Sequence, residues 1–166
     1  MANVTAIVLS GARFVEKTSA DVLPSPAIGS ATGQTTSSTS EVSLTTITLP
    51  AGTLAVNGQM IRITYYGRTT GVGTCTPRIK FGATYVDPNV PVTAPTSWAT
   101  QYIVVRTGAT AQRTHGSQLV DSVLPLLKTA TPGETLSGDV TIDFRGVVSL
   151  GTATLIVDAV LVEYWA

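Results

Sequence analysis

The chain has 166 residues, ten basic and ten acidic side chains, and a formal net charge of zero at pH 7. Charged residues make up 12% of the sequence, against about 25% in an average soluble domain, while hydrophobic residues make up 43%. This composition excludes an intrinsically disordered chain. It also disfavours a nucleic-acid binder or an anionic-membrane binder, because both need clustered Lys and Arg.

The first 23 residues contain two short apolar runs, at residues 4–9 and 13–15. No basic residue precedes the first run, and the run is too short for a signal peptide, so secretion by the standard route is not expected. We predict instead a β-prone N-terminal arm, residues 1–23, that docks on a partner. The docking side chains are expected to be Val4, Ile7, Val8 and Phe14.

No segment predicts a membrane span. The longest apolar stretch, residues 153–165, is interrupted by Asp158 and Glu163. It is also shorter than the roughly 20 apolar residues that a bilayer-spanning helix needs.

Residues 24–40 are rich in Pro, Ser, Thr and Gly, a composition typical of a flexible polar linker with little to bury. From residue 41 onward the pattern changes to short alternating segments and keeps that character. We therefore predict three parts: an arm at 1–23, a linker at 24–40 and a β domain at 41–166.

Alternation of apolar and polar residues predicts the strands of the β domain. In residues 139–145 the side chains of Val140, Ile142 and Phe144 share one face, and polar residues occupy the other. In residues 59–67 Tyr66 falls on the polar row. Strands are predicted at residues 44–49, 59–67, 76–86, 98–107, 139–145 and 154–165.

Turn signals separate these segments, and Asn57-Gly58 is the strongest hairpin signal among them. The only helix candidate is residues 117–128, but Pro125 lies inside it, and a crossing strand fits at least as well. Six to nine short strands predict an all-β fold, an antiparallel jelly-roll-like sandwich with an extended N-terminal arm.

Two predicted strands, residues 98–107 and 154–165, are apolar on both faces. A strand of this kind is covered on both faces, so one face meets the core and the other meets something else. A loop or the N-terminal arm could supply that cover; we favour a subunit interface, because surface charge is scarce. The interface side chains are expected to be Tyr102, Val104, Ile156, Val160, Val162 and Tyr164.

Residues able to carry catalysis or bind metal are few. His115 is the single histidine, and no metal-binding spacing surrounds it. Asp139 and Asp143 share a strand face about 13 Å apart, farther than paired glycosidase carboxylates. Cys75 is alone, so no intrachain disulfide can form. We predict a non-enzymatic protein without metal or cofactor.

An ordered set of motifs runs through residues 43–165. Leu-Pro-Ala-Gly-Thr-Leu at 49–54 is followed by Asn57-Gly58 and by Ile-Arg-Ile at 61–63. Further motifs are Arg-Ile-Lys-Phe-Gly-Ala-Thr at 78–84, Ser97-Trp98, the segment from Val105 to Gln112-Arg113, and Val162-Glu163. In their order and spacing, these motifs resemble jelly-roll modules of bacteriophage virion proteins.

The resemblance implies a homotrimeric virion protein, made in the host cytoplasm and assembled on the capsid exterior or the tail. Because the module makes up nearly the whole chain behind a short arm, we favour a capsid decoration (cement) protein. The alternative is a tail or fibre-tip protein that recognises a host carbohydrate or receptor. The expected partners are further copies of the chain and the major capsid protein or tail proteins, with a host glycan in the alternative. Nucleic acid and membrane insertion are not expected.

Overall fold

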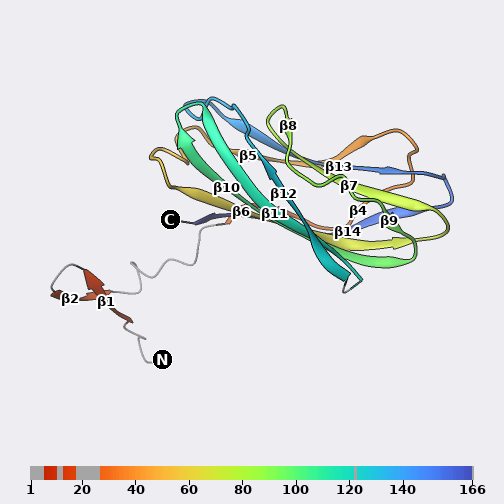
Figure 1. The fold of residues 1–166 in the computed structure, drawn as a ribbon, viewed down its shortest axis with the longest axis horizontal. Coiled ribbons are helices and arrows are strands. Elements are labelled where there is room, and N and C mark those ends of the chain that lie inside the picture. The colour runs from red at the N-terminus through yellow and green to blue at the C-terminus, as the bar shows by residue number, and fades with distance from the viewer. Residues whose placement is uncertain (1–5, 11–12, 18–26, 122, 166) are drawn as a thin grey trace.

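The computed structural model describes residues 6–10, 13–17, 27–121 and 123–165. Figure 1 shows two layers of β-strands packed face to face. Within these residues there is no helix, and thus none that could cross a membrane. The strands are β1 (Ala6–Ser10), β2 (Arg13–Lys17), β3 (Ala27–Ala31), β4 (Gln34–Thr36), β5 (Val42–Leu49), β6 (Met60–Thr70), β7 (Thr74–Phe81), β8 (Thr84–Tyr85), β9 (Val92–Thr93), β10 (Thr96–Gly108), β11 (Ala111–Val120), β12 (Val123–Ala130), β13 (Val140–Val148) and β14 (Thr154–Trp165).

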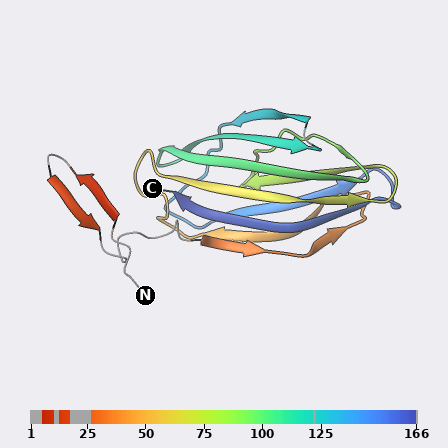
Figure 2. The ribbon, with the colours of Figure 1, turned by 90° about the horizontal axis from the view of Figure 1, so that it is seen from below.

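The two layers are antiparallel sheets. One has seven strands, in the order β12-β11-β10-β6-β14-β3 with β4 also paired to β14. Figure 2 looks onto this sheet and shows the order directly. The other has five strands, in the order β5-β13-β7-β8 with β9 paired to β7, while β1 and β2 form a separate hairpin. The predicted all-β, jelly-roll-like sandwich is confirmed.

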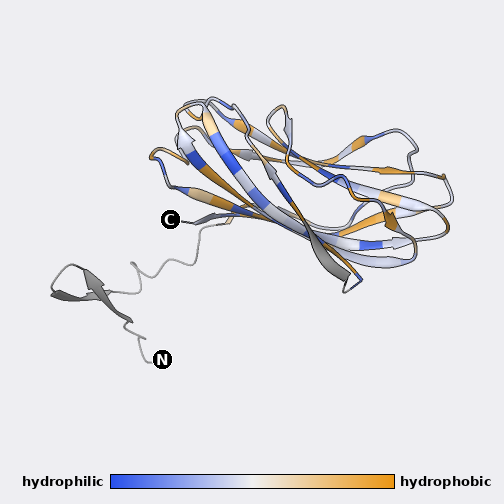
Figure 3. Ribbon diagram, viewed as in Figure 1, coloured by the Kyte–Doolittle hydropathy of each residue, from blue (hydrophilic) through white to orange (hydrophobic). Residues whose placement is uncertain are grey.

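The core lies between the two sheets and is built by the alternation that the sequence displays, which Figure 3 shows along the strands. Val140, Ile142 and Phe144 of β13 are buried, as predicted. The Tyr65 ring packs edge-on against Trp98 of its own sheet and Phe144 of the opposite sheet, at centroid distances of 4.7 and 5.2 Å. This aromatic cluster joins the two sheets near their centre.

Within the predicted linker at 24–40, residues 27–31 and 34–36 form strands. Strands β3 and β4 both pair with β14 and complete one edge of the seven-stranded sheet. Ile28 and Ala31 pack against the core, and Thr36 is buried. The prediction was wrong because a backbone ladder needs no large side chain, and Ser, Thr and Gly at a sheet edge give the same composition as a flexible linker.

Two further local predictions are resolved by the sheet order. Asn57-Gly58 is not a hairpin turn, since it connects β5 and β6, which belong to different sheets. Residues 117–128 are not a helix: they form the end of β11, a turn at Asp121, and most of β12. Pro125 lies in β12, the edge strand of its sheet, where a missing N–H donor is tolerated.

A β-bulge in β14 changes which of its side chains face the core. The register with β6 shifts between Val157 and Ala159, so that Asp158 is an extra residue. Beyond it, Val160 and Val162 are buried in the chain's own core. The strictly alternating assignment of β14 was therefore wrong, because one inserted residue exchanges the two rows.

Candidate binding face of the seven-stranded sheet

The outer face of the seven-stranded sheet carries the exposed large hydrophobic side chains of the strands. Seven such side chains are exposed among the described residues, and three of these lie in turns. The other four all lie on strands of this sheet, and none lies on a described strand of the five-stranded sheet. These four are Tyr66, Leu119, Leu127 and Trp165.

One end of this face is mainly apolar. The strand register places Val105 beside Met60, and Met60 beside Trp165. Ile103 lies in the next row and Leu161 in the row after it, and both are half-buried. We name the following set the apolar half: Met60, Ile103, Val105, Leu127, Leu161 and Trp165.

Charge beside the apolar half is paired only in part, because the exposed Arg113 of β11 lies next to Val105 in the register and makes no ion pair with the described residues. Arg62 lies between Ile103 and Glu163 in the register, and its Nε and Nη2 donate to Glu163 Oε2 at 2.9 and 2.7 Å. The guanidinium also lies 5.4 Å from the centroid of the Trp165 ring. This fixes the Trp165 indole on the outer face.

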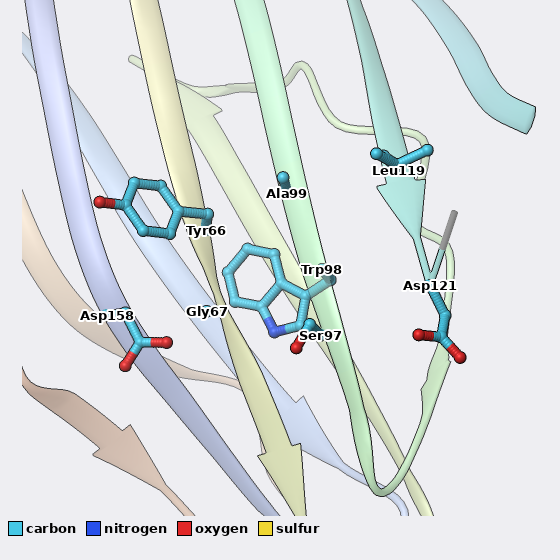
Figure 4. A pocket seen from close by; sticks show the side chains of 8 residues that line it. All are labelled: Tyr66, Gly67, Ser97, Trp98, Ala99, Leu119, Asp121 and Asp158. Atoms are coloured by element: carbon cyan, nitrogen blue, oxygen red, sulfur yellow. The ribbon is translucent and has the colours of Figure 1, made fainter. Parts of the chain in front are cut away.

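The opposite end of the same face contains a hollow of about 370 Å³, seen in Figure 4. Ala99 of β10 forms its floor, because it pairs with Tyr66 on one side and with Leu119 on the other. Ser97 and two carboxylates, Asp121 and Asp158, complete the rim. We name this feature the Tyr66 hollow.

Two features fix the rim of the Tyr66 hollow. Arg68 Nη1 donates to Asp158 Oδ1 across the bulge in β14. The backbone N–H of Asp121, which has a φ of 46°, donates to the Ser97 carbonyl at 3.2 Å. A second hollow of about 410 Å³ shares Ser97 and Asp121 with the first and extends to Arg68. The two hollows therefore adjoin each other at Ser97 and Asp121.

The outer face of the five-stranded sheet has a different character, because its charges are gathered into a cluster. Glu41 accepts hydrogen bonds from the Tyr85 hydroxyl and from Arg145 Nε, the latter at 2.5 Å. Arg145 Nη1 also donates to Asp143 at 2.6 Å. Arg78 donates to Asp87, which is almost fully buried, at 2.8 Å. A partner docking here would have to desolvate these groups.

The same contacts set the ionisation of Glu41. Burial acts to raise the pKa of this carboxyl, but hydrogen bonds from Tyr85 and Arg145 and the positive charges of Arg78 and Arg145 outweigh it. The pKa is therefore below its ordinary value. The cluster ties the start of β5 to β7, β8 and β13, which is a structural role.

The six predicted interface residues differ in how deeply the structure buries them. Val104, Tyr102, Val160 and Val162 are buried in the core of the single chain, so their side chains are not available to a partner. Tyr164 packs partly against that core. Ile156 is half-buried and pairs with Arg68 and Thr35 of the neighbouring strands.

The predicted arm-docking residues fall on or near the N-terminal hairpin. Ile7 and Val8 belong to β1, and Phe14 belongs to β2, opposite Leu9. Val4 lies outside the described residues. Docking by this arm remains a prediction.

His115 and Cys75 lie in different surroundings, one at the surface and the other in the core. His115 is exposed on β11, in a small hollow with Arg113 and Thr129. Asp121 lies six residues farther along, about 20 Å in an extended strand, and Asp143 lies on the other sheet. Burial raises the pKa of the Cys75 thiol, which is fully enclosed in the core.

Sequence reasoning missed the Tyr66 hollow. The alternation in residues 59–67 placed Tyr66 on the outward row, which the structure bears out. Its neighbours Ala99 and Leu119 are joined to it only by the strand register, so no local signal could have assembled the three.

The sequence matches no known protein family, and no curated protein is similar to it. The assignment of a function to this chain therefore depends on its motifs and on the two faces of the sandwich.

Proposed function

We propose that this chain is a non-enzymatic structural protein of a bacteriophage virion, a capsid decoration protein that assembles as a homotrimer. The observation that carries the proposal is the apolar half on the outer face of the seven-stranded sheet. It would supply the contact between copies around the threefold axis. The ordered motifs between residues 43 and 165 add the resemblance to virion jelly-roll modules.

The physical contrast between the two sheets selects the contact face. Burying apolar surface contributes about 25 cal/mol per Å², and Trp165 and Leu127 are 45% and 81% exposed in the single chain. The charge cluster around Glu41 and Arg145 would lose its hydration in an interface. A zero net charge also lets several copies pack closely without mutual repulsion.

The N-terminal arm would then attach the trimer to the particle. Residues 6–10 and 13–17 are β-strands paired only in a two-stranded sheet, and such a ribbon can add to the sheet edge of a neighbouring subunit or of the major capsid protein. Cementing by strand addition requires no catalytic residue and no cofactor.

Light scattering on the purified chain tests the oligomer. We expect a mass three times the 17.2 kDa of one chain, and a stable monomer at micromolar concentration would contradict the trimer. Localising the chain by electron microscopy of whole particles tests the site of assembly. Density over the capsid shell is expected, and density confined to the tail would contradict decoration.

The Tyr66 hollow favours a second candidate function, recognition of the host surface. A decoration protein needs no concave site, whereas a hollow of about 370 Å³ is within the range of small-molecule sites. In that case the purified protein should adsorb to host cells and block infection. Failure of the protein to compete with the phage would exclude this role.

A further inference from the structure

We infer that the Tyr66 hollow binds the ring of a neutral sugar. This rests on the second candidate function, host-surface recognition, and assigns the chemical class of its ligand. The hollow combines an exposed aromatic ring, a small floor residue and polar groups at the rim, and each part contributes a different contact.

The aromatic ring supplies the stacking surface. Tyr66 is 43% exposed, and Figure 4 shows its ring extending from β6 toward β14, seen face-on from the hollow. The face of an aromatic ring is electronegative, and the C–H groups along one face of a pyranose carry partial positive charge. A sugar can therefore lie flat on Tyr66, with Ala99 leaving the space beside the ring open.

The rim supplies hydrogen bonds to hydroxyl groups. Asp121 and Asp158 present carboxylate oxygens, and the Ser97 hydroxyl can both donate and accept. Bonds from hydroxyls to a carboxylate are the strong, charge-assisted kind. Sugar hydroxyls are donors as well as acceptors, so they match this rim.

The charges of the rim select against an anionic ligand. Arg68, which lines the adjoining hollow, is already engaged by Asp158, and Asp121 adds a negative charge. A phosphate or a sialic acid would meet two carboxylates and only one paired guanidinium. A neutral hexose carries no such penalty.

The size of the two adjoining hollows limits the ligand to a few sugar residues. The Tyr66 hollow, at about 370 Å³, is near the lower end of small-molecule sites and suits one ring. The adjoining hollow of about 410 Å³ shares the Ser97–Asp121 rim, so a second residue could continue the chain past Arg68. Met60, Val105 and Trp165 lie at the other end of the sheet, whereas Leu127 and Leu161 lie in the row next to Tyr66. A trimer contact centred on Met60, Val105 and Trp165 leaves the hollow open.

The test is a titration of the ¹⁵N-labelled protein with three neutral probes at millimolar concentration: the methyl glycosides of glucose, galactose and N-acetylglucosamine. At least one should shift the amide signals of Tyr66, Ala99 and Leu119. Tyr66→Ala should weaken binding about tenfold, whereas Tyr66→Phe, which keeps the ring, should retain it. Asp121→Asn should weaken binding severalfold while still fitting the turn, because Asn tolerates the left-handed region.

Leu150→Ala is the control, since it removes an exposed apolar side chain in the turn between β13 and β14, outside both the hollow and the apolar half; binding should be unchanged. Two results would overturn the inference: no shift with any of the three probes, or equal binding by Tyr66→Ala. If the protein adsorbs to host cells but binds no sugar, the ligand class is wrong and host recognition stands. If the protein binds a sugar but does not adsorb to host cells, the ligand class stands and host recognition is wrong.

Discussion

The Tyr102 ring covers the backbone of Gly116 on the neighbouring strand. The two residues are paired in the β10–β11 register, and a Cβ atom at Gly116 would lie 2.1 Å from Tyr102 Cδ1 and 2.5 Å from the Gln101 carbonyl oxygen. Trp98 stands in the same relation to Gly67 on β6. In both pairs an aromatic side chain fills the space that a glycine leaves on the inner face of the sheet.

Gly116→Ala should therefore destabilise the fold by about 2 kcal/mol, because the methyl group meets backbone as well as the ring. Urea denaturation measures the change. Gly151→Ala is the matched control, since no atom lies within 4 Å of its Cβ position, and its effect should stay within about 0.5 kcal/mol. Equal effects of the two substitutions would contradict the packing argument.

The two buried tyrosines should respond oppositely to loss of the hydroxyl. Within the described residues Tyr102 Oη has no hydrogen-bond partner, whereas Tyr65 Oη donates to the Arg145 carbonyl at 3.1 Å. Burial, and then the charge of Asp87, raise the pKa of Tyr102, so it is buried in the neutral form. Tyr102→Phe should be neutral or stabilising by up to about 1 kcal/mol, and Tyr65→Phe should cost about 1 kcal/mol.

Thermal and urea unfolding of both variants checks this prediction. A loss of stability in Tyr102→Phe as large as in Tyr65→Phe would mean that the Tyr102 hydroxyl has a partner.

The sequence predicts core residues correctly in strands where every second side chain is apolar and no residue is inserted. Val140, Ile142 and Phe144 could be assigned to the core because nothing interrupts their strand. Asp158 could not be recognised as a bulge, because a charged residue on the outward row and an inserted residue look alike in sequence. Because the bulge was not recognised, Val160 and Val162 were assigned to the outer face, whereas both are buried in the core.

The candidate site was predictable only in part, for a related reason. Tyr66 follows the alternation of its own strand, so its outward direction could be read locally. The hollow exists because Ala99 pairs with both Tyr66 and Leu119, residues distant in the chain. Strand order decides such neighbours, and the sequence alone specified strands without their order.

The corrected rows of β14 predict different consequences for adjacent residues. Val160→Asp places an unpaired charge in the core and should unfold the chain, at a cost of about 3–5 kcal/mol. Leu161→Asp lies on the outer face, in the apolar half, and should leave the single chain folded while dissociating the proposed trimer.

Circular dichroism and light scattering separate these two effects. Leu150→Asp, in the exposed turn between β13 and β14, is the control and should change neither fold nor mass. If the Leu161→Asp variant is still a trimer, the contact between copies lies elsewhere on the molecule. If the Val160→Asp variant is a folded monomer, Val160 belongs to an interface and not to the core.

Glu41 gives the fold a specific dependence on acid. Its pKa in the folded chain is below the ordinary 4.5, so the ionised carboxylate is favoured by folding. The resulting stabilisation is fully present above pH 4.5 and is lost as the pH falls through the folded-state pKa. At pH 7 Glu41→Gln should cost about 1–2 kcal/mol, because Tyr85 and Arg145 lose a charged acceptor.

As the pH falls below 4.5, the difference between Glu41→Gln and the native chain should shrink, because protonation removes the same charge from the native protein. Urea denaturation at a series of pH values between 7 and 3 measures this convergence. Asp158→Asn removes the exposed ion pair with Arg68 and should have little effect at any pH. If the difference in unfolding free energy between Glu41→Gln and the native chain stays constant across the series, the charge of the carboxylate does not hold β5 to the sheet. The packing of the side chain would then account for the whole effect.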